Sequence, residues 1–448
     1  MLENPKIRER LFFCTVCVLC VFRVSYLGFS YTPYLDDYVQ YFHYPSFENP
    51  WRSILWGGAK TAFTRPLAAF CDLFVWSAFS PQLGLAVAVI SLLFGLSAVL
   101  FFKAFSAAGF EMTPVFLAAY AFVPLNIEGV YWLSASSRVA VSLFLSALSC
   151  FFLMRGRNVL FAVFCFLSMW FYEQTAILSF FAVSGLILME RKRLWRLAVP
   201  TASALALAAY YLLFGAASDN AERLRTADLM TFFPNAAAQL KNLSEILFSV
   251  HGKIISRGFV RGIARIAADR AYIWLAALTV LCALLPALFP PQAKKRFAPS
   301  EAVFGASLAA AAALPFFLTA GNLPNVRSAV PIMVGAALVL DSFLPCLLRS
   351  AVPLLVSVCL FAFTAASVSE VCDYERTAQA DLHLARSIAA QLPSDSDSFE
   401  FTPSTPKYYP QNAPLRDHIV SMTGTDWGVT GIVRAVSGRR TLTIDVRY

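Results

Sequence analysis

Residues 11–38 read LFFCTVCVLCVFRVSYLGFSYTPYLDDY, an apolar segment that ends in two adjacent carboxylates. An apolar run of about 20 residues can cross a bilayer as a helix, and no convincing cleavage site follows it, so we expect the helix to be retained. Asp36 and Asp37 lie where this span meets water, and adjacent acids there can accept a proton or hold a cation. The alternative interpretation is a solvated loop.

The composition of the whole chain places it in the membrane class. Of its 448 residues, 58% are hydrophobic and only 14% are charged, and the mean hydropathy is +0.63. A water-soluble chain of this length is far less apolar. The net charge of +9 does not indicate nucleic-acid binding, because most basic residues fall in short loops between apolar runs, where they set topology and face anionic headgroups.

The apolar runs predict an all-α polytopic membrane protein with about eleven transmembrane helices. The predicted spans lie near residues 11–30, 82–102, 112–125, 136–154, 158–172, 175–189, 197–214, 271–289, 300–318, 328–345 and 351–368. Lys and Arg concentrate in alternate connections, which predicts a cytoplasmic N-terminus and an extracytoplasmic C-terminus. The same rule places Asp36 and Asp37 on the outer face.

We expect two domains. Residues 1–368 form the transmembrane domain, with outer loops at 31–81 and 215–270, and the aromatic stretch 51–56 reads as an interfacial turn. Residues 369–448 form a small extracytoplasmic α/β appendage, in which 372–392 has helical spacing and 399–401 and 442–446 alternate like strands.

The outer loop 215–270 contains a basic stripe. Lys253, Arg257, Arg261 and Arg265 recur every four residues, which places them on one face of a helix. A basic amphipathic helix lying on the membrane can hold a lipid phosphate. The alternative is that the stripe touches only bulk anionic headgroups.

Further polar residues gather at the outer ends of the predicted spans, where a charge in hydrocarbon is costly and usually faces a cavity. As catalytic candidates we take Asp36, Asp37 and Glu173. Candidates for binding a donor phosphate are Arg65, Arg138, Arg257, Arg261, Arg265 and Arg327. Candidates for binding a sugar or acceptor are Tyr38, His43, Glu128, Trp132, Gln174 and Asn325. Two alternatives stay open: Glu173 pairs with Arg138 or Arg327 only to hold helices in register, and His43 is an ordinary loop histidine.

The chain contains none of the common nucleotide or metalloprotease motifs. There is no GxxxxGK[ST], no GxGxxG after a strand, no HExxH and no GxSxG. We therefore expect extracytoplasmic chemistry with a donor that needs no soluble nucleotide site. Carboxylates, arginines and a basic interfacial helix suit a lipid-phosphate donor.

These residues carry a resemblance to a known group. The first span followed at once by Tyr34-Leu35-Asp36-Asp37-Tyr38, and Arg65-Pro66-Leu67 before the next span, resemble the bacterial integral-membrane glycosyltransferases of the GT-C fold. Within that group the chain is most similar to polyprenyl-phosphate-sugar-dependent enzymes, such as serotype-converting glucosyltransferases and the protein-mannosyltransferase and aminoarabinose-transferase relatives. The resemblance covers roughly residues 8–368.

The resemblance implies transfer of a sugar from a polyprenyl-phosphate donor to an envelope glycan, lipid or protein, at the outer face of a bacterial inner membrane. It implies that Asp36 or Asp37 is the general base on the acceptor hydroxyl, and it favours Asp36. In some relatives these acids also bind a divalent cation, so a Mg²⁺ or Mn²⁺ ion at Asp36 and Asp37 stays open, with no other cofactor implied. The roles of Glu173, Arg138 and Arg327 rest only on the cost of charge in a membrane.

Two other classes of function compete with the transferase. A transporter or flippase of lipid-linked saccharides usually places charges near the bilayer midplane and has paired broken helices in two halves. Here the charges cluster at one leaflet, and no internal repeat is visible. An O-antigen polymerase or ligase would also use outer-loop arginines, but it would not need the acidic pair.

Overall fold

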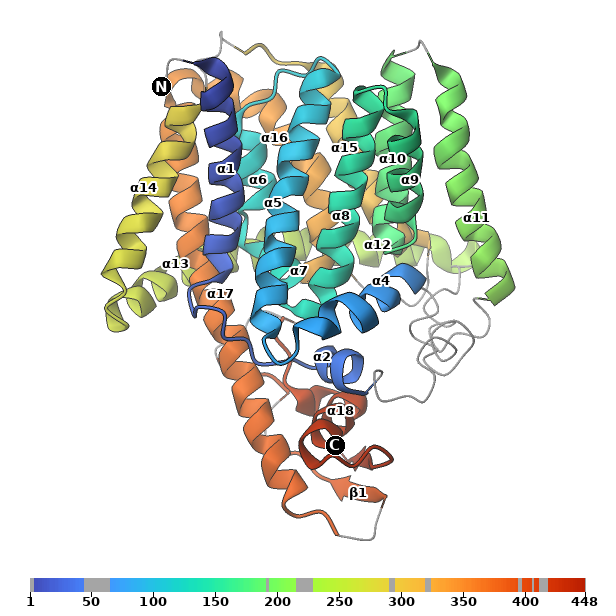
Figure 1. The fold of residues 1–448 in the computed structure, drawn as a ribbon, viewed down its shortest axis with the longest axis vertical. Helices are drawn as coiled ribbons and strands as arrows, with labels where there is room; N and C mark the ends of the chain where they lie inside the picture. Colours follow the sequence, from blue (N-terminus) through green and yellow to red (C-terminus); the bar gives the residue numbers. More distant parts are fainter. Residues whose placement is uncertain are drawn as a thin grey trace.

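Long helices dominate the structure, as the apolar runs predict. The computed structural model describes residues 4–43, 65–190, 193–214, 229–289, 295–318, 324–393, 397–404, 407–410 and 418–447. Figure 1 shows the long helices side by side in one bundle, with the N-terminus at one end and the C-terminal segment projecting from the other. We name these the N-terminal end and the tail end of the bundle.

The helices of the bundle alternate in direction along the chain. They are α1 (Pro5–Val24), α5 (Leu83–Ala107), α6 (Pro114–Ala121), α8 (Leu133–Met154), α9 (Asn158–Met169), α10 (Glu173–Glu190), α11 (Ala198–Phe214), α14 (Tyr272–Leu288), α15 (Pro299–Leu318), α16 (Ala329–Leu348) and α17 (Val352–Ala389). Shorter elements are α2 (Asp36–Tyr38), η1 (Val39–His43), α4 (Pro66–Cys71), η4 (Asp72–Trp76), η5 (Ser77–Phe79), η6 (Pro124–Ile127), α7 (Glu128–Tyr131), η7 (Leu194–Leu197), η10 (Val326–Ser328), η11 (Arg349–Ala351) and η13 (Met422–Gly424).

Within the described residues, seven helices are long and apolar enough to cross a membrane. The number is eight if α6 and the following η6–α7 segment, bent by 52° at a short break, form one span. The polytopic all-α class is therefore confirmed, whereas the predicted total of about eleven spans is not. The shorter α9 and α14 run beside the seven, as does α1, which carries charged residues near both ends.

One helical segment runs across the bundle instead of along it. It consists of α12 (Leu229–Ser244), η9 (Glu245–Val250) and α13 (His251–Ala268), and it lies near the tail end (Figure 1). The helix predicted from the basic stripe is thus confirmed as α13. Its small residues Gly258 and Gly262 face Ala366 and Ala365 of α17, where a larger side chain would meet the α17 backbone, so the two helices pack closely.

The short helix α6 is completely buried, and charged side chains from other helices face both of its ends. The carboxylate of Asp341 accepts hydrogen bonds from the backbone N–H groups of Thr113 and Phe116 at its N-terminus, at 3.1–3.2 Å. Arg23 of α1, itself fully buried, donates from Nη1 to the carbonyl of Ala121 at the C-terminus, at 2.8 Å. The negative charge lies at the positive end of the helix dipole and the positive charge lies at its negative end. Both interactions are attractive, and they stabilise α6 inside the protein.

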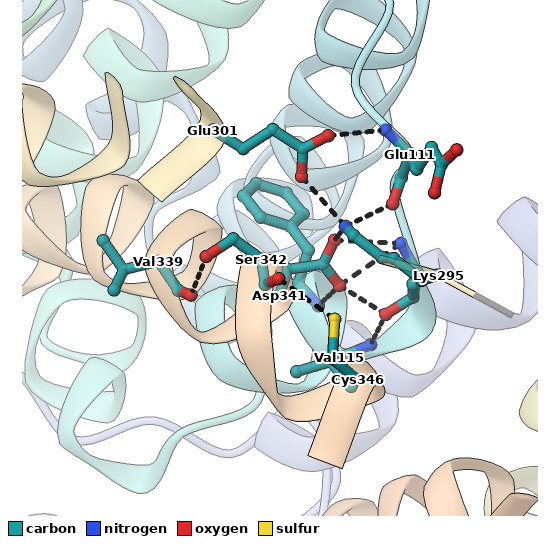
Figure 2. Close-up of polar contacts among 10 residues, drawn as sticks. Glu111, Val115, Lys295, Glu301, Val339, Asp341, Ser342 and Cys346 are labelled. Atoms are coloured by element: carbon teal, nitrogen blue, oxygen red, sulfur yellow. Dashed lines mark hydrogen bonds and ion pairs between the residues drawn. The ribbon is translucent and has the colours of Figure 1, made fainter. Parts of the chain in front are cut away.

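A buried ionic cluster at the N-terminal end holds α6, α15 and α16 together (Figure 2). Nζ of Lys295 lies 3.0 Å from Oδ2 of Asp341 and 3.0 Å from Oε2 of Glu301, and it donates to the carbonyl of Glu111. The other oxygen of Glu301 accepts from the backbone N–H of Glu111 at 2.8 Å. One cation with two acids and two backbone partners satisfies charges that would be costly to bury singly.

The C-terminal segment contains the elements that the sequence predicts, together with one helix that it did not. The helix α17 continues to Ala389 and so passes through the predicted domain boundary at 368. The strands β1 (Ser398–Phe401) and β2 (Thr443–Val446) confirm both predicted strands and pair in parallel, with Phe399 opposite Ile444. The additional helix is α18 (Asp426–Ser437), which packs against α17 and β2. The predicted interfacial turn at 51–56 lies outside the described residues.

Candidate functional site

The acidic pair lies on the short helix α2, at the tail end between the bundle and α18 (Figure 1). The residue before it, Leu35, has φ of 43°, a conformation that is strained for a branched side chain. Strain of this kind persists only where the surrounding packing enforces it. The chain is therefore held in one conformation immediately before Asp36.

Asp37 is fully buried, and both of its oxygens are engaged. Oδ2 accepts from the hydroxyl of Tyr31 and, at 2.9 Å, from the backbone N–H of Tyr34. Oδ1 accepts at 2.8 Å from the backbone N–H of Ser134, at the start of α8. This carboxylate fastens α2 to the bundle.

Asp36 differs from its neighbour in burial and in partners. Its side chain is half-buried, and it makes no hydrogen bond or ion pair with any residue that the structure describes. A general base must reach the proton that it removes, so a carboxylate with free oxygens is better placed than an engaged one. The two adjacent acids thus differ: Asp37 is hydrogen-bonded to the bundle, whereas Asp36 has no partner among the described residues.

The geometry does not build a cation site from the pair. No group of three His, Cys, Asp or Glu side chains with metal-binding geometry occurs among the described residues, and the oxygens of Asp37 already accept hydrogen bonds. Asp36 alone would offer a free carboxylate. A Mg²⁺ or Mn²⁺ ion at Asp36 and Asp37 therefore does not fit the donor set.

Burial also sets the protonation of Asp37. It raises the pKa of this carboxyl from 3.8 to about 7, against the opposing effect of the hydrogen bonds that it accepts. Since the folded pKa exceeds the ordinary value, this group stabilises the fold fully below pH 3.8, and that contribution is lost as pH rises through about 7. Near neutral pH the protonation state of Asp37 is therefore sensitive to its surroundings.

A second buried acid, Asp72, lies close to the pair. Oδ1 of Asp72 accepts from the hydroxyl of Tyr41 at 3.0 Å, and Oδ2 lies 3.8 Å from Nη2 of Arg138. With its amide oriented to suit both neighbours, Gln40 donates to Asp72 at 3.1 Å and accepts from Arg138. Burial raises the pKa of Asp72 to about 6 and the charge of Arg138 opposes the rise. Arg138, predicted to bind a phosphate, is thus already paired.

Glu173 finds a partner that the sequence analysis did not predict. Nε of Arg65 lies 3.0 Å from Oε1 and 2.9 Å from Oε2 of Glu173, and the Arg65 guanidinium stacks 4.7 Å from the centre of the Tyr172 ring. The alternative prediction of pairing with Arg138 or Arg327 is wrong. The pair joins α4 to α10, with each side chain about a quarter exposed (29% and 24%).

Trp132 connects the acidic pair to the start of α16. Its indole N–H donates to the carbonyl of Tyr34 at 3.1 Å, and the guanidinium of Arg327 lies over its ring at 4.8 Å. Arg327 is half-buried and makes no ion pair with a described residue. A cation with no counterion among the described residues is therefore held close to Tyr34, two residues before Asp36.

Two predicted binding residues support this part of the fold. Asn325 accepts at 3.1 Å from the backbone N–H and at 2.7 Å from the hydroxyl of Ser328, which fixes the turn that carries Arg327. Gln174 donates at 2.6 Å to the carbonyl of Ser328. Tyr38 is buried, with a hydroxyl that has no partner among the described residues. The side chain of His43 lies outside the described part of the chain.

The basic stripe divides into paired and unpaired cations. Arg261 forms a bidentate pair with Asp373 of α17, at 2.7 and 2.5 Å, and Arg265 pairs with Asp269 at 2.7 Å. Lys253 and Arg257 are exposed and make no ion pair with a described residue. Within the described part of the chain, therefore, two of the four stripe cations have a carboxylate partner and two have none.

Sequence reasoning missed the buried groups that the C-terminal segment supplies. Glu128, a predicted binding residue, lies 3.0 Å from Nδ1 of His418, and Nε2 of His418 lies 2.5 Å from Oε2 of Glu370. All three side chains are buried. The signal in the sequence was the acidic run Glu370, Asp373 and Glu375 directly after an apolar span, but nothing in it singles out His418 as a partner.

Comparison with protein-family models, with curated proteins and with solved structures finds no match for this chain.

Proposed function

We propose that the protein is a membrane glycosyltransferase of the GT-C type. It moves a sugar from a polyprenyl-phosphate donor to an envelope glycan, lipid or protein, on the extracytoplasmic face of a bacterial inner membrane. The observation that carries this proposal is Asp36, a half-buried carboxylate with no partner among the described residues, which buried Asp37 holds at the tail end of an apolar bundle.

The reaction requires a base and a phosphate-binding cation. Asp36 takes the proton of the acceptor hydroxyl while the hydroxyl oxygen attacks the anomeric carbon of the sugar. The bond between that carbon and the phosphate oxygen breaks, which releases polyprenyl phosphate. Positive charge near the departing phosphate lowers the barrier. Arg327 and Arg257 support this role because neither forms an ion pair among the described residues, whereas Arg65, Arg138, Arg261 and Arg265 are committed to carboxylates.

The test is mass spectrometry of envelope glycans and lipid-linked sugars in cells with and without the gene. We expect polyprenyl-phosphate sugar to accumulate, and one sugar substituent to be missing, when the gene is deleted. The purified protein in vesicles should then release polyprenyl phosphate when donor and acceptor are both present. Unchanged glycans and donor levels after deletion would contradict the proposal.

The unpaired half of the basic stripe gives a prediction on donor use. Arg257→Glu replaces by an anion the exposed cation that we assign to the donor phosphate, so we expect kcat/KM for the donor to fall on the order of tenfold or more. The measurement is the initial rate in vesicles at varied donor concentration. Lys241→Glu on α12 is the matched control, because it makes the same charge change at another exposed position of the helical segment that runs across the bundle. Equal effects of both changes would mean that only bulk headgroup attraction is at work.

A second candidate function is favoured by one observation. The break between α6 and η6–α7, with buried Arg23 at the end of α6, resembles the discontinuous helices of transporters. A flippase of lipid-linked saccharides would move the donor across vesicle membranes without any acceptor. Loss of the outer-leaflet intermediate in the deletion strain, with no accumulation of donor on that leaflet, would favour this function.

A further inference from the structure

His418 lies between two acidic side chains that belong to different elements of the bundle. Nδ1 faces Glu128 of α7 at 3.0 Å, and Nε2 faces Glu370 of α17 at 2.5 Å. Ionised carboxylates only accept hydrogen bonds, so both ring nitrogens must donate, which only the imidazolium form can do. The histidine is 1% exposed, so this bridge is shielded from water.

The residues that follow His418 are fixed by further contacts to the bundle and α17. The hydroxyl of Tyr34 donates to the carbonyl of Val420. Asp381 of α17 accepts from the hydroxyl of Ser421 at 2.7 Å and from the backbone N–H of Met422 at 2.8 Å. The Tyr34 contact reaches the segment that carries the acidic pair.

The helix α18 then packs directly on α2 and η1. Two of its small residues make the close approach possible: Gly428 faces Leu35 and Gly431 faces Val39. The acidic pair thus lies between the bundle and the C-terminal segment. Movement of α18 away from the bundle would uncover the helix that holds Asp36.

We propose that residues 418–437 are an integral wall of the Asp36 site, and that His418, as an imidazolium held between Glu128 and Glu370, is the positioning residue that keeps this wall in place. The docking of the segment is independent of the chemistry performed there. That docking of this segment affects binding of the acceptor rests on the proposed function.

The charges around His418 give the docking a pH dependence. Glu370 and Glu128 raise the pKa of His418 from 6.5 to about 10, although burial acts in the opposite direction. Tyr374 packs edge-on against the His418 ring, with the ring centres 5.9 Å apart. The next charges lie one residue further out: Arg327 of η10 acts on Tyr374, and the pair of Asp373 with Arg261 acts on Glu370. Because the docked pKa is the higher one, docking is strongest below pH 6.5 and weakens on the order of tenfold per pH unit up to about 10.

Hydrogen–deuterium exchange of the full chain in lipid nanodiscs tests the docking. In His418→Gln at pH 7 we expect residues 418–437 to exchange on the order of tenfold faster or more, with unchanged exchange in the bundle, because two carboxylates then face each other without a cation. His383→Gln, an exposed histidine on α17, is the matched control and should behave as the wild type. Equal protection in His418→Gln and the wild type would overturn the proposal.

A spectroscopic measurement keeps the proposal testable if that variant does not fold. The chain has four histidines, so ring-¹⁵N-labelled histidine gives four imidazole rings to follow in the wild type. We expect one imidazole to stay protonated above pH 8, and we expect the protection of 418–437 to decline from pH 6.5 to about 10 after correction for intrinsic exchange. Deprotonation of all four rings below pH 8 would refute the imidazolium bridge.

Activity provides a separate readout. If the transferase proposal holds, His418→Gln should raise the KM for the acceptor more than it lowers kcat, since the wall is displaced while Asp36 remains. Faster exchange of 418–437 in a protein without transferase activity would support the docking and refute only the proposed function. If residues 418–437 stay protected in a His418→Gln protein that has transferase activity, the result would support the proposed function and refute the role of His418 in docking.

Discussion

Asp36→Asn is expected to abolish sugar transfer while leaving the protein folded. The change removes the only carboxylate of the pair with free oxygens but keeps its size, and general base catalysis typically contributes 10²–10⁴-fold to a rate. We therefore expect kcat to fall by about 10²–10⁴, with little change in the melting temperature. The measurement is the initial rate of polyprenyl phosphate release by the purified variant in vesicles.

Asp37→Asn is the informative comparison for this experiment. In the wild type, the two oxygens of Asp37 accept hydrogen bonds from the backbone N–H groups of Tyr34 and Ser134. In Asp37→Asn one of these oxygens is replaced by an NH₂ group, which cannot accept, so one backbone N–H loses its acceptor. Such a loss costs about 1–3 kcal/mol. We expect Asp37→Asn to lower both thermal stability and activity, and Asp36→Asn to lower activity alone. Full activity in Asp36→Asn would remove the base from the mechanism.

The largest effect on stability is expected from Lys295→Met. Lys295 is the cation of the buried cluster in Figure 2, and Met fills similar space without its charge. Removal leaves Asp341 and Glu301 buried without a counterion, and breaking a buried pair in this way typically costs about 3–5 kcal/mol. We expect a clear drop in the unfolding temperature of the detergent-solubilised protein.

The control for this prediction is an ion pair of a lysine and a glutamate at the same end of the bundle but nearer the surface. Lys103 lies 3.5 Å from Glu9, and the two side chains are 35% and 54% exposed. An exposed pair contributes about 0–1 kcal/mol, so Lys103→Met should change the unfolding temperature little. The double change Lys295→Met with Asp341→Asn should recover part of the lost stability. A Lys295→Met protein as stable as Lys103→Met would contradict the ionic account of this cluster.

Local patterns in the sequence were enough to predict several features correctly. Hydropathy alone predicts the polytopic helical class, because apolar runs of sufficient length have one stable solution in a bilayer. The four-residue spacing of Lys253 and Arg257 with two further arginines predicts α13, and the alternation in 399–401 predicts β1. Each prediction depends only on residues within a few positions of one another.

The same reasoning fails where length and polarity are marginal. The helix α9 has 12 residues and α1 carries Arg23 inside its apolar run, so hydropathy does not decide whether either crosses a membrane. The helix α18 was missed because it is short and contains Gly428 and Gly431, which disfavour a helix locally but allow close packing on Leu35 and Val39. Packing context, not local preference, determines these elements.

What the sequence by itself determined is the kind of protein and the presence of two adjacent acids after the first span. Only the tertiary structure decided that Asp37 is engaged and that Asp36 has no partner among the described residues, because the donors to Asp37 include Ser134, 97 residues away. It likewise decided that Glu173 pairs with Arg65 and that His418 bridges to Glu128 across 290 residues. Hydropathy and periodicity act over one helix, whereas the pairing of buried charges depends on which helices pack together, and that information is spread over the whole chain.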